Sequence, residues 1–178
     1  MTFHKILVAL DISSPEVERV FQEALKVAKT EGSHLMLFHC ISWENEEKIN
    51  PLAGIGTLGN VNLHTILKQF SQASWTEQVK QVRSQLQRYC DTAESQGISV
   101  EYQYQVGNPS ALICEQAKDW NADLVIVGRR NRMKWSEFLL KSVSSSVLHH
   151  ASCSVFVIQT ETACTKHQSA SQTQPVYN

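Results

Sequence analysis

Two kinds of apolar pattern alternate along this chain. Short apolar runs occupy residues 5–10, 34–41, 124–127 and 154–159, and residues 98–106 alternate apolar with polar side chains. Runs of this length predict buried strands, and the alternation predicts a strand with one less protected face. Between the runs, apolar residues recur at steps of three and four, which predicts amphipathic helices.

The helix boundaries carry their own signals. Ser14 suits an N-cap and Pro15 the first helical position, and Gly32 suits the end of that helix. Asn108 and Pro109 repeat the same start signal further along. Helices are therefore predicted at residues 14–32, 75–97, 109–120 and 142–150.

Five strands and four helices in strand–helix–strand order predict one α/β domain over residues 1–160. Its fold class is a single doubly wound, five-stranded parallel sheet flanked by about four helices, which is Rossmann-like. Residues 43–74 open with a polar run and carry Pro51, so we expect a variable excursion there. Residues 161–178 are rich in Gln, Ser and Thr without periodicity, which predicts a disordered C-terminal tail.

The excursion contains Gly54, Gly56 and Gly59, which spell the dinucleotide-binding pattern G-x-G-x-x-G. A true fingerprint follows the first strand directly, whereas this one follows a charged segment after the second strand. A flexible excursion is the favoured interpretation. A mobile lid over a site is the next alternative, and dinucleotide binding is the least favoured.

Composition narrows the class of protein. The formal net charge of -1 over 178 residues disfavours nucleic-acid binding, and no apolar run approaches the length of a membrane span. The apolar start meets Asp11 too early for a signal peptide. Five scattered cysteines without a C-x-x-C pair fit reduced thiols, with those at 40, 90, 114 and 153 buried. These features predict a cytoplasmic protein with no membrane or nucleic-acid partner.

A strand, a glycine, a basic loop and a hydroxyl-rich helix start follow one another at residues 124–146. Backbone N–H groups and the positive end of a helix dipole converge in such an arrangement, so it predicts an anion site. Arg129, Arg130, Arg132 and Lys134 make the loop basic. They are interpreted first as a solvated face, second as replacement phosphate ligands, and last as a nucleic-acid contact, since no aromatic residues interleave with the charges.

Signals for catalysis and metal binding are weak. The chain has no G-x-S-x-G, Walker or H-E-x-x-H motif, and Asp11 has no evident catalytic partner. His149 and His150 would point about 100° apart on a helix, so they suit one metal ion poorly. His39, in the second strand, is interpreted as a packed core residue. No catalytic residue and no metal ligand is predicted.

Several segments together resemble the universal stress protein family. They are KILVALD, LFHC, VGNP, NADLVIVGRR and SVSSSVLHHASCSVFVI, and the likeness covers residues 1–160. The nucleotide-binding branch of that family carries G-x-x-G-x9-G-[S/T] after the fourth strand. Gly128 and Ser142 fill the first and last positions here, while Asn131 and Lys141 replace the other two glycines.

The two replacements decide what the loop can hold. Asn tolerates the left-handed backbone region better than other non-glycine residues, so Asn131 could preserve the turn. Lys141 would either block the phosphate position or form a salt bridge to it. The nucleotide-binding positions that the resemblance implies are Ala9, Leu10, Asp11, Cys40, Gly128, Arg129, Asn131, Lys141, Ser142, Val143 and Ser144.

The resemblance implies three functions in decreasing order of preference. The first is a non-enzymatic, homodimeric stress-response module with a degenerate nucleotide loop and an unknown protein partner. Its last strand, with Val155, Val157 and Ile158, would pair across a two-fold axis. The second is a sensor that binds ATP or AMP, with magnesium, in a remodelled phosphate site. The third is a slow nucleotide hydrolase.

Overall fold

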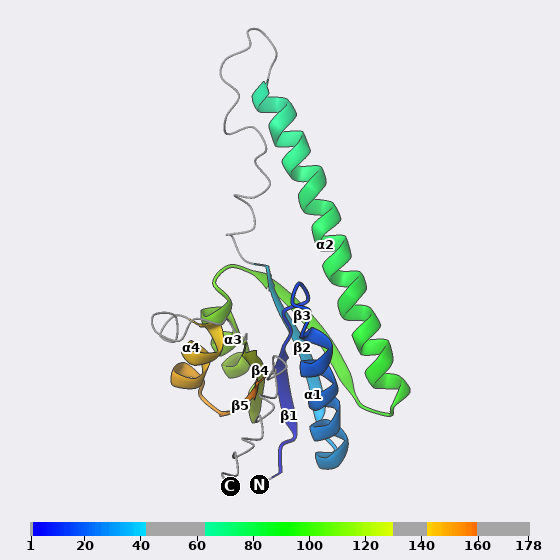
Figure 1. Ribbon diagram of the computed structural model, residues 1–178, viewed down its shortest axis with the longest axis vertical. Helices are drawn as coiled ribbons and strands as arrows, with labels where there is room; N and C mark the ends of the chain where they lie inside the picture. The colour runs from blue at the N-terminus through cyan, green and yellow to red at the C-terminus, as the bar shows by residue number, and fades with distance from the viewer. Residues whose placement is uncertain (1, 42–62, 130–141, 160–178) are drawn as a thin grey trace, which may run out of the picture.

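The strands form one parallel sheet of order β3-β2-β1-β4-β5 (Figure 1). A computed structural model describes residues 2–41, 63–129 and 142–159, with side chains from Ser74 onward in the second range. The strands are β1 (Lys5–Ala9), β2 (His34–Ile41), β3 (Val100–Val106), β4 (Leu124–Arg129) and β5 (Ser154–Gln159). The helices are α1 (Val17–Glu31), α2 (Leu63–Ser95), α3 (Pro109–Asp119) and α4 (Val143–His150). The predicted doubly wound fold is confirmed.

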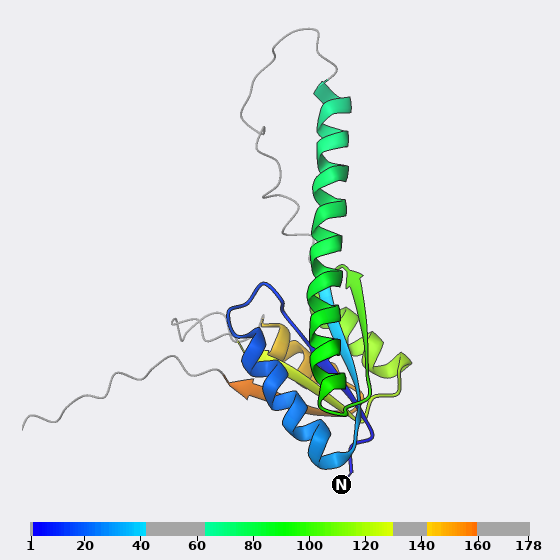
Figure 2. The same ribbon diagram turned by 90° about the vertical axis from the view of Figure 1, so that its right-hand side faces the viewer.

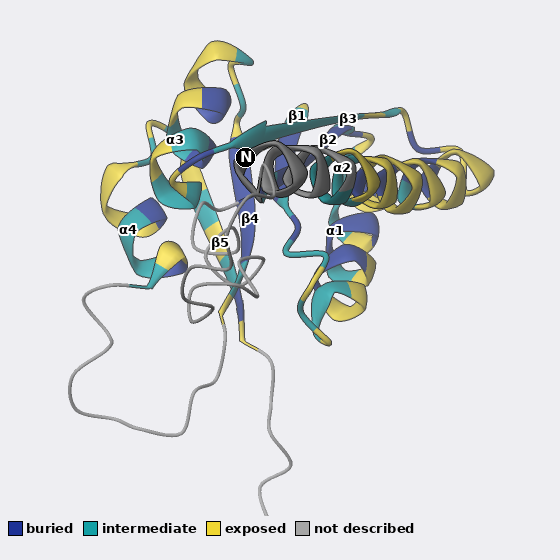
Figure 3. Ribbon diagram, turned by 90° about the horizontal axis from the view of Figure 1, so that it is seen from above, coloured by how far each residue is buried: buried dark blue, intermediate teal, exposed yellow. Residues whose placement is uncertain are grey.

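Helices cover both faces of the sheet, as Figure 3 shows from above. Ile6 and Val8 of β1 belong to the core beneath α1 and α2, whereas Leu7 belongs to the core beneath α3 and α4. All three side chains are fully buried. Because successive side chains of a strand point to opposite faces, an uninterrupted apolar run is what a strand between two helical layers requires.

Helix α2 begins at Leu63, twelve residues before the predicted start at Trp75. Its first half extends beyond the sheet in Figures 1 and 2. Val82, Leu86 and Ala93 in its second half are buried in the core. The remaining excursion, residues 43–62, lies outside the described residues. No helix in the described ranges has the length and apolarity that a membrane span needs.

The predicted N-cap at Ser14 is wrong, because α1 starts at Val17 with Glu16 at the N-cap position. Two successive turns precede the helix: the N–H of Ser14 donates to the Asp11 carbonyl at 2.9 Å, and that of Val17 to the Ser14 carbonyl at 3.2 Å. The Ser-Pro pair therefore lies in these turns, before the first residue of the helix. The corresponding prediction for α3 is confirmed, since Asn108 caps it.

The prediction that four cysteines are buried holds fully for Cys90 alone. Cys40, Cys114 and Cys153 are half-buried, although each packs at the border of the core beneath α3 and α4. Cys40 lies near the end of β2, Cys114 in α3, and Cys153 in the connection between α4 and β5, all at the edge of this core. None of these four thiols forms a disulfide.

Candidate functional site

The strand order reverses between β1 and β4. From β1 the chain moves outward to β2 and β3, and then returns to place β4 on the other side of β1. Ala9 of β1 is in register with Val127 of β4, so Leu10 and Gly128 follow side by side at the carboxyl ends of the two strands. Open α/β sheets bind ligands in the crevice that forms at such a reversal.

The floor of the crevice expected at this reversal is the end of β1. Leu10 is buried, and its N–H donates to the Phe38 carbonyl at 2.9 Å. His39 Nδ1 lies 2.8 Å from the Leu10 carbonyl, which makes that ring nitrogen the donor. Burial lowers the pKa of His39 below its usual value, and the hydrogen bond to Leu10 opposes this only in part. His39 is thus the packed core residue that was predicted.

Asp11 connects the crevice to the start of α1. Its Oδ1 accepts hydrogen bonds from the Ser13 hydroxyl at 2.6 Å and from the Ser13 N–H at 3.3 Å. Its carbonyl accepts from Ser14. The carboxylate therefore holds the turn that leads into the helix, and its oxygen at the crevice rim is oriented by that turn.

Gly128 at the end of β4 is close to α1. A Cβ atom on this residue would lie 2.7 Å from Cγ2 of Val20, a separation that real Cβ atoms essentially never show. The φ angle of Gly128 is outside the left-handed region. The approach of α1 to the sheet is thus sufficient to require glycine here, whatever a phosphate would add.

The start of α4 supplies the polar end of the crevice. Ser142 is the N-cap, and its Oγ accepts the N–H of Ser145 at 3.2 Å, while the N–H of Ser146 begins the helical ladder. The N–H groups of Val143 and Ser144 have no acceptor within the described part of the chain. Unpaired N–H groups at a helix start carry the positive end of the helix dipole and bind anions.

Cys40, at the end of β2, is on the opposite side of β1 from β4. Its Sγ is 3.9 Å from the Pro109 carbonyl, and burial raises the pKa of the thiol to about 12. The thiol is therefore protonated at neutral pH. A small, neutral and half-buried side chain of this kind suits the wall of a pocket for a flat apolar ring.

Most of the predicted site residues lie at the carboxyl ends of the strands. Ala9, Leu10 and Asp11 come from β1 and its loop, Cys40 from β2, Gly128 and Arg129 from β4, and Ser142, Val143 and Ser144 from the start of α4. The short connection from α4 to β5 turns at the amino ends of the strands, so α4 must begin near their carboxyl ends. Asn131 and Lys141, together with Arg130, Arg132 and Lys134, lie outside the described residues.

Within residues 2–41, 63–129 and 142–159, no three His, Cys, Asp or Glu side chains gather as metal ligands would. His149 and His150 are both exposed, and His150 Nδ1 is 2.8 Å from the Ser146 carbonyl one turn earlier. Their position at the end of α4 gives them favourable contact with the negative end of its dipole.

The edge strand β5 carries a residue that the sequence interpretation missed. Phe156 is 43% exposed, whereas Ile158, one of the three residues predicted for an interface, is buried in the core of its own chain. Val155 and Val157 are half-buried. Because successive side chains of a strand point to opposite faces, Phe156 occupies the opposite face from Val155 and Val157, and this could have indicated it.

The parallel sheet of order 3-2-1-4-5 between two helical layers has the adenine nucleotide alpha hydrolase-like fold. The model of the universal stress protein family matches residues 2–159, and the chain belongs to that family. Universal stress protein Sll1388 of Synechocystis sp. is 37% identical over 161 residues, covering 89% of this chain and 99% of the relative.

Solved structures resemble this fold at low sequence identity. A universal stress protein in complex with cAMP has a TM-score of 0.60 and 18% identity, covering 89% of this chain and 98% of the other. The universal stress protein from Archaeoglobus fulgidus in complex with dAMP has a TM-score of 0.56 and 20% identity, covering 88% and 98%. Both likenesses establish the fold, and the ligands are those of the two relatives.

Proposed function

We propose that this chain is a stress-response module that binds an adenine nucleotide, AMP or ATP, in the crevice between β1 and β4 and does not hydrolyse it. The observation that carries the proposal is the pair of N–H groups of Val143 and Ser144, which have no acceptor among the described residues. The Ser142 cap fixes the geometry of this helix start before any ligand arrives. A phosphate there would meet oriented donors and a helix dipole.

The rest of the crevice has the polarity of a nucleoside site. Cys40 offers a neutral wall for the base, and Asp11 offers a carboxylate oriented by Ser13 at the rim, where it could accept from a ribose hydroxyl. Arg129, exposed at the end of β4, adds a positive charge at the phosphate end. The complexes of two structural relatives with cAMP and dAMP support an adenine nucleotide as the ligand class.

The phosphate loop would be a remodelled one. Asn131 and Lys141 stand where the nucleotide-binding branch has glycines, so the loop offers fewer close approaches to bare backbone. The ammonium group of Lys141, next to the Ser142 cap in sequence, would compensate by pairing with a phosphate oxygen. Magnesium would accompany ATP, with the phosphates as its main ligands.

No step on the nucleotide is proposed. Hydrolysis needs a base that activates water, and Asp11 Oδ1 is committed to the turn into α1 through Ser13. His39, which contacts this end of β1, is buried and directs Nδ1 to the Leu10 carbonyl. The module would therefore act by changing the contacts it makes when nucleotide is bound.

A second candidate is a module whose nucleotide site has decayed and which acts only through dimerisation and protein contacts. Gly128 favours it, because the contact with Val20 explains this glycine without any phosphate. The exposed Phe156 on the edge strand favours an interface there. Pairing of two β5 edges across a two-fold axis would cover both the ring and the open backbone.

Calorimetric titration of the full chain with AMP and ATP, with and without magnesium, separates the two candidates. Saturable binding that weakens in Lys141→Glu supports the nucleotide-binding module, since the variant replaces an attraction for phosphate by repulsion. Lack of binding at millimolar nucleotide supports the decayed site. Phosphate release above a catalyst-free blank, lost in Asp11→Ala, would contradict both.

A further inference from the structure

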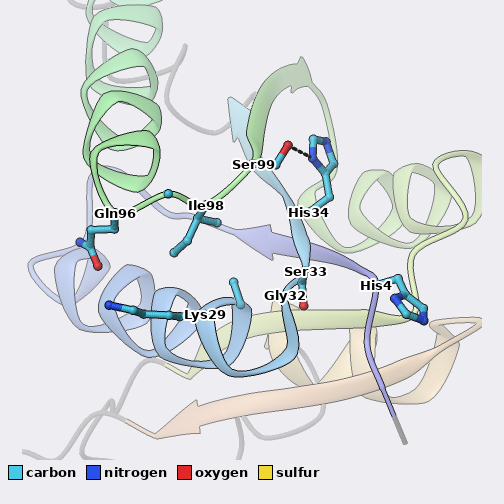
Figure 4. Close-up of a pocket in the computed structure, with 10 residues that line it drawn as sticks. His4, Lys29, Gly32, Ser33, His34, Gln96, Ile98 and Ser99 are labelled. Carbon is cyan, nitrogen blue, oxygen red and sulfur yellow. Dashed lines mark hydrogen bonds between the residues drawn. The ribbon is translucent and has the colours of Figure 1, made fainter.

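A second group of polar side chains lies at the amino ends of the strands, away from the nucleotide crevice. Ser99 Oγ is 2.6 Å from His34 Nδ1, and His34 Nε2 is 3.1 Å from Glu101 Oε1 (Figure 4 shows the Ser99–His34 bond). Hydroxyl, imidazole and carboxylate thus form one continuous hydrogen-bonded chain. This order of groups is what activates a serine nucleophile.

The carboxylate of Glu101 determines which ring nitrogen of His34 carries the proton. Ionised Glu101 can only accept, so the proton of the neutral imidazole sits on Nε2. Nδ1 then carries the lone pair, and the Ser99 hydroxyl donates to it. The two ring nitrogens are exchanged relative to the usual triad, but a base on one nitrogen and a carboxylate on the other is preserved.

Backbone pairing and an outer contact hold this chain in place. The N–H of His34 donates to the His4 carbonyl at 2.8 Å, and that of Leu35 to the Ser99 carbonyl at 2.9 Å, so neighbouring strands fix the spacing of serine and histidine. Trp120 Nε1 donates to the same Glu101 Oε1 at 2.9 Å. The tryptophan is itself held by Lys5, whose Nζ donates to its carbonyl at 3.0 Å.

The serine and the histidine line a cavity of about 330 Å³. Its other walls come from the ends of α1 and α2, where Gly32 and Gly97 adopt left-handed φ angles of 68° and 77°. A Cβ atom on either glycine would meet nothing within 4 Å, so both positions open onto unfilled space. Lys29 and Gln96 also belong to the lining.

We propose that Ser99, His34 and Glu101 hydrolyse small activated esters in this cavity, with Ser99 as nucleophile, His34 as general base and acid, and Glu101 as the positioning carboxylate. Ser99 Oγ attacks the ester carbonyl carbon while its proton passes to His34 Nδ1. The bond to the leaving alcohol breaks, and the alcohol takes that proton. Water then attacks the acyl-serine, giving its proton to Nδ1, and the acid leaves as the proton returns to Ser99.

This activity is independent of the nucleotide crevice, and no short sequence motif indicates it. The three residues come from two adjacent parallel strands, β2 and β3, and the residue just before β3, so no short sequence pattern contains them. The expectation that the chain is not an enzyme rested on the absence of such patterns.

A fluorophosphonate probe tests the proposal on the full chain, with peptide mass mapping of the adduct. We expect one adduct, on Ser99, that is absent in Ser99→Ala and forms at least about 100-fold more slowly in His34→Gln. Ser95→Ala is the matched control, because Ser95 is also an exposed serine but donates to the Thr92 carbonyl instead of an imidazole. It should label like the natural chain.

Two further variants keep the test informative if the first two fold poorly. Glu101→Gln preserves an acceptor for Nε2 but removes the charge, and Trp120→Phe removes the indole donor while keeping an aromatic ring. Both should slow labelling and the release of p-nitrophenolate from p-nitrophenyl acetate, with unchanged circular dichroism. The absence of an adduct, an adduct on another serine, or equal rates in Glu101→Gln and the natural chain would overturn the proposal.

Discussion

Val20 of α1 leaves no room for a side chain on residue 128 of β4, since a Cβ atom there would lie 2.7 Å from Val20 Cγ2. Gly128 also fills the first position of the loop that we propose as the phosphate site. One residue thus satisfies a packing requirement on one side and stands next to the candidate phosphate site on the other. Substituting Val20 can separate the packing role of Gly128 from any role in phosphate binding.

Gly128→Ala should destabilise the fold by about 1–3 kcal/mol, the usual cost of overpacking a core. Val20→Ala removes the obstructing methyl group, so the double variant should lose less stability than the sum of the single variants. Urea unfolding of all four proteins measures this coupling. Strictly additive losses would show that Val20 is not what requires the glycine.

The buried His39 should make stability depend on pH. Burial lowers its pKa in the folded chain below 6.5, so the unfolded chain binds the proton more readily. Neutral His39 therefore costs the fold no stability above pH 6.5. The free energy of unfolding decreases as the pH falls through the pKa of His39 in the folded chain. Urea unfolding at pH 7.5 and pH 5 should show a smaller loss for His39→Gln than for the natural chain. The carboxylates and other histidines are common to both proteins, so equal losses would contradict this origin.

Phe156 should support self-association through β5. Phe156→Lys would place a charge at the centre of the proposed interface, so we expect light scattering to change from a dimer mass to the monomer mass of 20.1 kDa. Gln87→Lys adds the same charge at an exposed position of α2 and should leave the dimer intact. A monomer mass for the natural chain over a wide concentration range would contradict the dimer.

The fold was predictable because buried parallel strands appear in the sequence as apolar runs, and because apolar residues recur every three or four positions in the helices. The start of α2 was missed although Leu63, Ile66, Leu67 and Phe70 recur at that spacing. Because glycines and Pro51 lie nearby, the whole segment was predicted to belong to the excursion. The start of α1 was placed too early because a Ser-Pro pair suits a turn as well as a helix cap.

For the crevice, the sequence predicted which motif positions would contribute residues, but not which contacts those residues make. The sequence indicates Gly128 but cannot reveal that Val20, more than a hundred residues earlier, requires it. The Ser99–His34–Glu101 chain depends in the same way on the register between β2 and β3. Contacts between segments distant in the sequence leave no local signal, so both findings needed the three-dimensional structure.

The phosphate site can be probed at one N–H group. Val143 is the first residue of α4, where proline is well tolerated, and Ser142 before it has the extended φ and ψ of -79° and 144° that precede proline. Val143→Pro should therefore keep the helix while removing one of the two donors. Val143→Ala is the control, because it trims the side chain and keeps the N–H group.

Calorimetric titration of AMP into the natural chain, Val143→Ala and Val143→Pro is the most direct test of nucleotide binding at the start of α4. We predict saturable binding to the natural chain and to Val143→Ala. Binding to Val143→Pro should be about 10-fold or more weaker, as expected when a charge-assisted hydrogen bond of roughly 1.5–3 kcal/mol is lost. Equal affinity in all three proteins, or no binding to any of them, would contradict a phosphate site built on Val143 and Ser144.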